Sequence, residues 1–249
     1  MTSTHQDPRG RAVADFFDAE SARYDRAYER SGADGRALRR RLEVALRLLG
    51  DGPGDVLDAG MGGGRLCVEL DRRGWNVAGI DIASGMVELA RARLPHARER
   101  LIQASIDDLP FADESFDAVV ATGVLEFMGA DLRRAVEELA RVLRPGGIAV
   151  VSFPNHRAPL LVWRGRVLYP AVRAIKRRVR IGNPPPPDAP ILPLAALRDA
   201  LAAVGLDIEL TEALSVRPVP SKLAERLERS NSMLARLLAT QIVIRARKR

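Results

Sequence analysis

The sequence has one cysteine, few aromatic residues and no long apolar run. With Cys67 alone among 249 residues, the chain has neither a disulfide framework nor the spacing of a Cys/His zinc site. No stretch reaches the roughly 18 apolar residues of a membrane-spanning helix, and the first residues, MTSTHQDPRGR, lack the apolar core of a signal peptide. The aromatic content of 4% leaves few rings to stack on nucleic-acid bases. We therefore expect a globular protein of the cytoplasm with no metal site.

Acidic residues are also missing from one part of this basic chain. The formal net charge is +7 and the isoelectric point about 10.4, values that fit nucleic acid, anionic membranes or acidic ligands as partners. Eight lysines and arginines fall between residues 156 and 187, where no acid occurs. Apolar residues recur there at helical spacing, and Pro170 divides the stretch. The pattern predicts two short amphipathic helices, followed by a stiff linker, NPPPP, at 183–187.

A glycine-rich turn organises the chain. The stretch Asp55–Leu70 (DVLDAGMGGGRLCVEL) predicts a strand, a turn and the start of a helix. Gly60, Gly62 and Gly64 alternate in the turn, and Asp58 stands before the first of them. Glycine permits a positive φ and close approach of a ligand to the backbone, beside the free N–H groups of a helix start. Such turns also connect strands to helices without binding anything, so the alternative is a purely structural turn.

A second acid follows the next predicted strand. Trp75–Ile80 is that strand, and Asp81 ends it. Because the carboxyl ends of adjacent parallel strands face one crevice, Asp81 can accept hydrogen bonds from the hydroxyls of a ribose; the alternative is an aspartate that caps the next helix. A dinucleotide fingerprint would need a third glycine at Arg65, and Asp58 would repel a pyrophosphate. A cationic cofactor suits the two acids better.

Four motifs in order resemble those of class I S-adenosylmethionine (SAM)-dependent methyltransferases: VLDAGMGGG, GIDIASGM, LPFADESFDAVVATGVLEFM and RVLRPGGIAVVSFPN, over about Val56–Asn155. The resemblance implies an α/β, Rossmann-like fold with a seven-stranded sheet of order 3-2-1-4-5-7-6 between helices. It also implies SAM as the cofactor, with the methionine moiety held by the glycine turn and the ribose held by Asp81.

The resemblance divides the chain into four segments. We expect an N-terminal helical cap (1–50), a SAM-binding core (51–155), a basic lid (156–190) and a segment (191–249) that completes the sheet. In the cap, FFDAESARYD is similar to the opening F-D-x-x-A-x-x-Y-D of family members. Tyr24 is therefore a candidate to close over the methionine end, or a ring that merely packs the cap on the core. The cap's second helix, Gly35–Leu49, carries an apolar stripe with its arginines off that stripe.

Periodicity and turn signals predict the remaining elements. The expected strands are Arg100–Ala104, Phe116–Thr122, Ile148–Phe153, Leu206–Leu214 and Gln241–Ala246. The expected helices are Gly85–Leu94, Ala130–Leu143, Leu194–Val204 and Ser221–Ala239. The segment Arg144–Gly147 (RPGG) should stop the second of these helices.

The adenine end of the cofactor has four candidate residues, which follow the second and third predicted strands: Ile82, Met86, Ser105 and Ile106. Ile82 and Met86 could sandwich the ring, although core packing explains such residues equally well. Family members often place an acid at the position of Ser105 to accept the adenine amino group. Ser105 can accept a hydrogen bond without charge, and Asp107 or Asp108 is an alternative acceptor.

The acceptor should meet the methyl group beside Gly123–Phe127, after the fourth strand. If the acceptor is a phenol or an alcohol, a general base assists. The candidate catalytic residues are Glu126 and His156, at the ends of the fourth and fifth strands. Glu126 could instead orient an amine or bond to the cap, and His156 could be an ordinary loop histidine. Family members often carry a histidine near Phe127, which this chain lacks.

We therefore predict a SAM-dependent methyltransferase of small molecules, with a lipophilic or anionic, natural-product-like acceptor as the hypothesis. The basic lid, and within it residues 157–181, could bind that acceptor or lie on a membrane surface; a lid packed on the core with solvated arginines is the alternative. A nucleic-acid (tRNA or rRNA) methyltransferase is disfavoured, because Gly123–Phe127 lacks the Asn/Asp-Pro-Pro-aromatic motif of amino-methylating enzymes. A non-catalytic SAM-binding protein is the remaining alternative.

Overall fold

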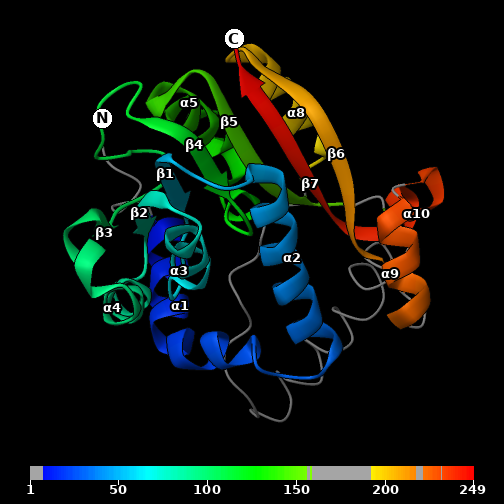
Figure 1. Cartoon of the computed structure of the whole chain (residues 1–249), viewed down its shortest axis with the longest axis horizontal. Helices are drawn as coiled ribbons and strands as arrows, with labels where there is room; N and C mark the ends of the chain where they lie inside the picture. The colour runs from blue at the N-terminus through cyan, green and yellow to red at the C-terminus, as the bar shows by residue number, and fades with distance from the viewer. Residues whose placement is uncertain (1–7, 156–157, 159–191, 217–220, 231) are drawn as a thin grey trace.

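The computed structural model describes residues 8–155, 158, 192–216, 221–230 and 232–249. Its centre is a seven-stranded sheet of order β3-β2-β1-β4-β5-β7-β6 (Figure 1), which confirms the predicted order. The strands are β1 (Gly54–Ala59), β2 (Trp75–Asp81), β3 (Leu101–Gln103), β4 (Phe116–Ala121), β5 (Leu143–Pro154), β6 (Leu206–Val216) and β7 (Ala239–Lys248). Strands β1 to β5 pair in parallel, and β7 lies antiparallel between β5 and β6.

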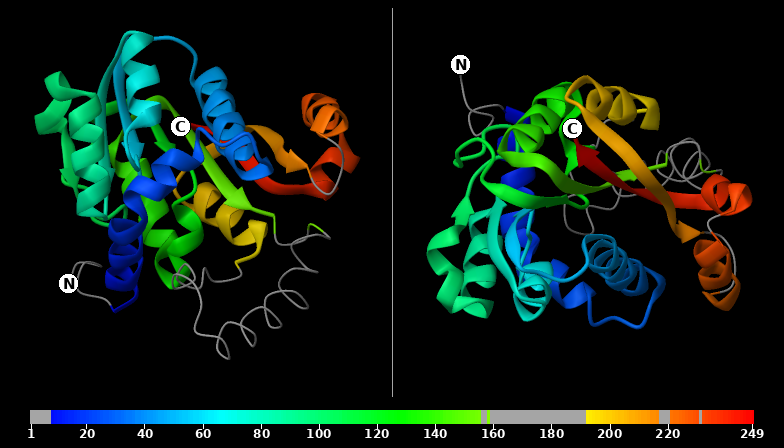
Figure 2. Two further views of the ribbon diagram at one scale, coloured as in Figure 1. Left: turned by 90° about the horizontal axis from the view of Figure 1, so that it is seen from below. Right: turned by 45° about the horizontal axis from the view of Figure 1, so that its top comes forward.

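Helices cover both faces of the sheet. On one face lie α2 (Ala33–Leu49), α3 (Arg65–Arg72) and α4 (Ser84–Arg93), and on the other lie α5 (Leu132–Val142) and α8 (Leu194–Ala203) (Figure 2). Successive strand residues face opposite layers: Val56 of β1 packs with the α2–α4 layer and Leu57 with the α5–α8 layer. Both side chains are fully buried, as expected for a central parallel strand.

The remaining elements lie at the ends of this sandwich. The first helix, α1 (Pro8–Ala27), packs against α4. Three short 3-10 helices connect the core elements: η2 (Pro95–Arg100), η3 (Leu125–Phe127) and η4 (Gly129–Asp131). Beyond the sheet, α9 (Ser221–Ser230) and α10 (Met233–Leu238) contact β6 and stand at the far end of the β6–β7 pair (Figure 1).

Two stretches differ from the sequence-based prediction. The helix expected over 130–143 ends at Val142, and β5 begins at Leu143, before the RPGG segment. The register of β5 against β4 shifts between Phe116 and Ala118, so the glycines lie in the irregular start of a strand. The single helix expected over 221–239 is two helices, because the Ser232 side chain accepts a hydrogen bond from the backbone N–H of Ala235 and caps a new helix, α10.

The predicted basic lid (156–190) and its linker lie outside the described residues, apart from Ala158, and His156 lies outside them as well. The membrane-contact hypothesis for 157–181 therefore stays a sequence-based prediction. Within the part of the chain that the structure describes, no helix is long and apolar enough to cross a membrane.

Candidate functional site

A cavity opens where β1, β2 and β4 end at the carboxyl edge of the sheet. The empty space in it, including the open mouth, is about 1160 Å³. Residues of α1 and α2 form the opposite wall. All of the predicted cofactor residues except Gly64 line this cavity: Tyr24, Asp58, Gly60, Gly62, Asp81, Ile82, Met86, Ser105 and Ile106.

The three glycines of the turn meet different constraints. Each has a positive φ: 87° at Gly60, 52° at Gly62 and 77° at Gly64. A Cβ at Gly64 would lie 2.8 Å from the Cβ of Ala90, so this glycine allows α3 to pack on α4. A Cβ at Gly62 would meet nothing within 4 Å, and Gly62 lines the cavity. Gly62 is thus placed for a ligand, whereas Gly64 is a packing residue.

Asp81 holds the glycine turn in place. Its Oδ2 accepts a hydrogen bond from the backbone N–H of Gly62 at 2.8 Å, and its Oδ1 accepts one from the N–H of Ala83 at 3.0 Å. Burial raises the pKa of Asp81 to about 6, against the lowering effect of these two bonds. The N-terminus of α4 has a different carboxylate, since Asp18 of α1 accepts from the N–H of Gly85 at 2.6 Å. Asp18 performs the capping role that was the alternative for Asp81.

Asp58 is a buried acid at the end of β1. The residue is 2% exposed, and its side chain accepts a weak hydrogen bond from the Cys67 thiol at 3.5 Å. Burial raises the pKa of Asp58 to about 7; the charge of Asp81 also raises it, while Cys67 and Arg41 lower it. A nearby cation would favour the ionised form of such a carboxyl. This end of the cavity therefore suits a positively charged ligand.

Arg41 is a functional candidate that the sequence analysis missed. The prediction placed the arginines of α2 off its apolar stripe, but Arg41 is 8% exposed and lines the cavity. Its Nη2 donates a hydrogen bond to the Tyr24 hydroxyl at 3.1 Å, and its Nη1 lies 2.2 Å from where a Cβ of Gly123 would be. Burial lowers the pKa of Arg41, but Tyr24, Tyr28 and Glu126 raise it above its ordinary value, so the group is cationic.

The signal for Arg41 was present in the helical spacing. Arg41 stands three residues after Leu38 and four before Ala45, which places it at the edge of the apolar stripe. The absence of a side chain at Gly123 gives its guanidinium room. Among the described residues, no carboxylate pairs with it at salt-bridge distance. The charge of Glu126 acts on Arg41 from beyond that distance. The guanidinium lines the cavity and can still pair with an anionic group of a ligand.

Two acids fasten α1 across the cavity. Asp18 bonds to the start of α4, as described above, and Asp25 accepts hydrogen bonds from Nε and Nη2 of Arg65 at 2.8 Å and 3.0 Å. Asp25 also bonds to Arg93, which donates to the carbonyl of Gly63 in the glycine turn. Burial raises the pKa of Asp25, but the two arginines outweigh it and lower the pKa overall. The helix that carries Tyr24 is therefore tied directly to the turn.

The structure describes only one of the two predicted catalytic residues. Glu126 lies in η3 after β4 and does not line the cavity, although its neighbours Val124 and Phe127 do. Burial raises the pKa of Glu126, with Arg41 opposing, and its Oε2 has no hydrogen-bond partner among the described residues. His156 falls outside those residues. A general-base role for either one stays a prediction.

The side chains predicted to lie at the adenine line the cavity and also pack in the core. Met86 is 1% exposed and Ile106 is 3% exposed, and both line the cavity beside Ile82. Core packing and contact with a ligand are thus compatible for them. Among the described residues, no three His, Cys, Asp or Glu side chains are grouped so that they could hold a metal ion.

Comparisons with known proteins identify the family. Residues 57–151 match the family model of the methyltransferase domain. The chain is 40% identical over 166 residues to demethylmenaquinone methyltransferase of Mycobacterium sp. (strain KMS), an alignment that covers 64% of this chain and 67% of the relative. The chain belongs to the class I SAM-dependent methyltransferases.

The chain spans less than two thirds of the length of some other curated relatives. Malonyl-[acyl-carrier protein] O-methyltransferase of Serratia marcescens is 35% identical over 156 residues, which cover 61% of this chain but only 56% of that relative. Geranyl diphosphate C-methyltransferase of Streptomyces coelicolor A3(2) has the same fold, with a TM-score of 0.66 and 18% identity over 98% of this chain and 99% of that one. The family uses SAM, and the two acids near Gly62, the buried Asp58 and the partly buried Asp81, fit a cationic cofactor.

Replacing Asp58 with asparagine should stabilise the cofactor-free methyltransferase. The pKa of Asp58 is raised from 3.8 to about 7, so the folded protein retains a proton that the unfolded chain loses. Stability from this group therefore falls as the pH rises between these two values. Because asparagine has no proton to lose, Asp58→Asn should raise Tm by about 2 °C or more at pH 8 and by less at pH 5.

Thermal melts of the wild type and Asp58→Asn at pH 5 and pH 8 measure this difference. Asp108→Asn, at an exposed carboxyl, is the control and should leave Tm unchanged at both pH values. A lower Tm for Asp58→Asn at pH 8 would contradict the account of Asp58 as a destabilised buried carboxyl.

Proposed function

We propose that this chain is an enzyme that transfers a methyl group from SAM to a small-molecule acceptor. The observation that carries the proposal is the pair of carboxyls, the buried Asp58 and the partly buried Asp81, that lie beside the glycine turn in one cavity. When bound, SAM supplies a methyl group on a positively charged sulfur, which needs no further activation by the protein. The residues of this chain then bind the donor, orient the acceptor and exclude water.

Each end of the cofactor has a candidate partner in the cavity. Asp81, at the end of β2, would accept hydrogen bonds from the ribose hydroxyls. Asp58, at the end of β1, would lie on the side of the positive charges. Arg41 would hold the carboxylate of the methionine moiety, because a guanidinium binds carboxylates well and Arg41 reaches the cavity between Tyr24 and Gly123.

An apolar section of the same cavity supports a lipophilic acceptor. Val13 and Met128 are each 8% exposed and line it, together with Phe17 and Phe127, whose ring centroids lie 5.6 Å apart edge to face. Two relatives are named demethylmenaquinone methyltransferase and malonyl-[acyl-carrier protein] O-methyltransferase. Their names give a small molecule and a carrier-bound molecule as the acceptors. For this chain we propose only that the acceptor is apolar.

We also propose the cytoplasm as the location of this protein, because a chain with one cysteine has no disulfide framework.

Incubation with methyl-labelled SAM tests the proposed activity. Supplied with apolar phenols and quinols as a panel, the chain should transfer label into an organic-extractable product, and total tRNA should stay unlabelled. Label that appears in tRNA would support the nucleic-acid alternative, and SAM binding without transfer to any panel member or to RNA would support a non-catalytic role.

The ribose assignment predicts the effect of removing Asp81. Asp81→Ala should weaken SAM binding tenfold or more, which corresponds to about 1.4 kcal/mol. Asp81→Asn keeps an acceptor for the N–H of Gly62 and isolates the loss of charge, so its effect should be smaller. Calorimetric titration gives both affinities. An unchanged affinity in the alanine variant means that Asp81 does not contact the cofactor.

The carboxylate assignment predicts a change of preference when Arg41 is replaced. The wild type should bind S-adenosylhomocysteine at least tenfold more tightly than its decarboxylated analogue, which keeps the ammonium group. Arg41→Met should bind the two equally. Arg40→Met is the matched control, since the neighbouring Arg40 pairs with Glu43 and Glu228 instead. A preference that survives in Arg41→Met assigns the carboxylate to another residue.

A further inference from the structure

Large apolar side chains are exposed together on α9 and α10, outside the site described above. Met233 is 90% exposed, and three others are about half exposed: Leu223, Leu234 and Leu237. Among the described residues, two further large apolar side chains are exposed, both on β6. Single exposed apolar residues are common on protein surfaces. A group of them on two helices in contact with each other indicates a surface that binds something.

The exposed apolar side chains are additional to those that pack these helices on the protein. Ala235 of α10 is fully buried, and three neighbouring residues pack against the same core cluster: Ala224, Leu227 and Leu238. Met233 and Leu237 are four residues apart, so they share another face of α10, and Leu234 adjoins it. The two helices therefore have one apolar face on the core and a second one that is open to the surroundings.

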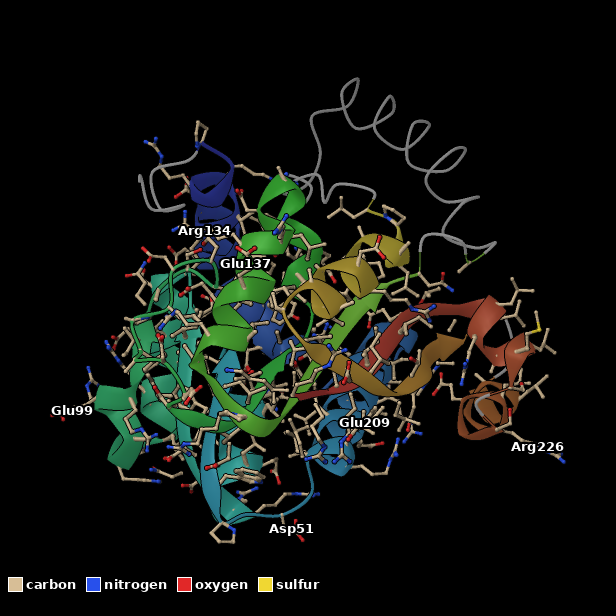
Figure 3. All side chains as sticks on the ribbon, turned by 90° about the horizontal axis from the view of Figure 1, so that it is seen from above. Asp51, Glu99, Arg134, Glu137, Glu209 and Arg226 are labelled. Carbon is tan, nitrogen blue, oxygen red and sulfur yellow. The ribbon has the colours of Figure 1, made fainter. Side chains whose placement is uncertain are left out.

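The charged side chains exposed beside this open face are basic. Arg226 of α9 is exposed and points away from the protein (labelled in Figure 3), and Arg236 of α10 is exposed as well. The described side chains of the two helices include a single acid, Glu228, which is 9% exposed and pairs with Arg40 of α2 at 3.5 Å. Positive charge beside exposed apolar side chains is the combination with which helices bind the surface of an anionic membrane.

The open face lies at the same edge of the sheet as the cavity. β7 begins at Ala239, directly after α10, and its Gln241 pairs with Pro154 at the end of β5. β5 runs parallel to β4, and the cavity opens at the carboxyl ends of β1, β2 and β4. A bilayer bound to α9 and α10 would therefore lie at the edge of the sheet where the cavity opens.

We propose that the open face of α9 and α10 binds the surface of an anionic lipid bilayer, with Met233, Leu234 and Leu237 entering the headgroup region and Arg226 beside the lipid phosphates. Apolar side chains and positive charge are the two contributions that stable attachment requires. A second copy of this chain is a poorer partner, because it would bring like charges together. The surface is separate from residues 157–181, and neither SAM binding nor methyl transfer takes part in the contact.

A fluorescent label at position 233 tests the proposed contact directly. Cys67 is the one cysteine of the chain and is buried, so Met233→Cys supplies a single reactive thiol for nitrobenzoxadiazole, a dye whose emission rises in an apolar environment. Vesicles of phosphatidylcholine and phosphatidylglycerol in equal parts should raise the emission, and pure phosphatidylcholine should raise it much less. The same label on Ile208→Cys, at the opposite end of β6, is the matched control and should not respond.

Cosedimentation of unlabelled variants with the same anionic vesicles measures the contribution of each group. The triple variant Met233→Ser/Leu234→Ser/Leu237→Ser should bind about tenfold more weakly or worse than the wild type. Arg226→Glu should lose a similar factor of about ten or more. Arg72→Glu changes the net charge by the same amount at an exposed arginine of α3, and it should bind like the wild type.

Three results would overturn the proposal. Vesicle binding that leaves the emission of the label at position 233 unchanged places the membrane contact elsewhere in the chain, as does a triple variant that binds like the wild type. A dimer seen by equilibrium sedimentation without lipid, and lost in the triple variant, assigns the open face to a second copy. If the triple variant does not fold, Arg226→Glu and the labelled Met233→Cys still decide. SAM binding should be equal in all these variants, so a failure of the proposed function is seen separately.

Discussion

The site depends on the hydrogen bond between Asp81 and the N–H of Gly62. This bond joins the end of β2 to the glycine turn that follows β1. One carboxylate therefore fixes the distance between these two parts of the cavity wall. Since Asp81 also binds the N–H of Ala83, both of its oxygens are held by backbone. A carboxylate fixed in this way cannot turn out of the cavity. The shape of the turn and the position of Asp81, the acid proposed to bind the ribose, are therefore set together by one hydrogen bond.

Helix α1, which forms part of the cavity wall, is held in place by charged side chains more than by apolar packing. The buried residues of α1 are Gly10, Val13 and Asp25, which is a small apolar contribution for a helix of this length. Asp18 and Asp25 are seven residues apart and so lie on one face of α1, where each meets a donor group of the core. Ion pairs are screened by salt, whereas apolar contacts are not. The attachment of α1 to the core is therefore sensitive to ionic strength.

The sequence predicted the features that depend on residues close together in the chain. It missed the features that depend on contacts between residues far apart in the chain. The strands, the glycine turn and Asp81 follow from short patterns, and the sheet order followed from the family resemblance. The role of Gly64 could not be read locally, because it is set by Ala90 on another helix. Arg41 was missed for the same reason: an arginine beside an apolar stripe is usually solvated, and its burial here depends on Tyr24 and on the missing side chain of Gly123.

The distribution of charge in the cavity selects the ligand more sharply than the glycines do. A dinucleotide would bring two phosphates to the glycine turn, where the buried Asp58 and the partly buried Asp81 would repel them. A sulfonium amino acid has the opposite arrangement, with positive charges for the acids and one carboxylate for Arg41. Glycine turns of this kind serve many ligands. Here a buried acid, a partly buried acid and a buried guanidinium line one cavity, and this set of charges suits a zwitterion with an excess of positive charge. The resemblance of the sequence to SAM-dependent enzymes and the electrostatics of the folded cavity thus point to the same ligand, and Arg41 supports it from outside the four motifs.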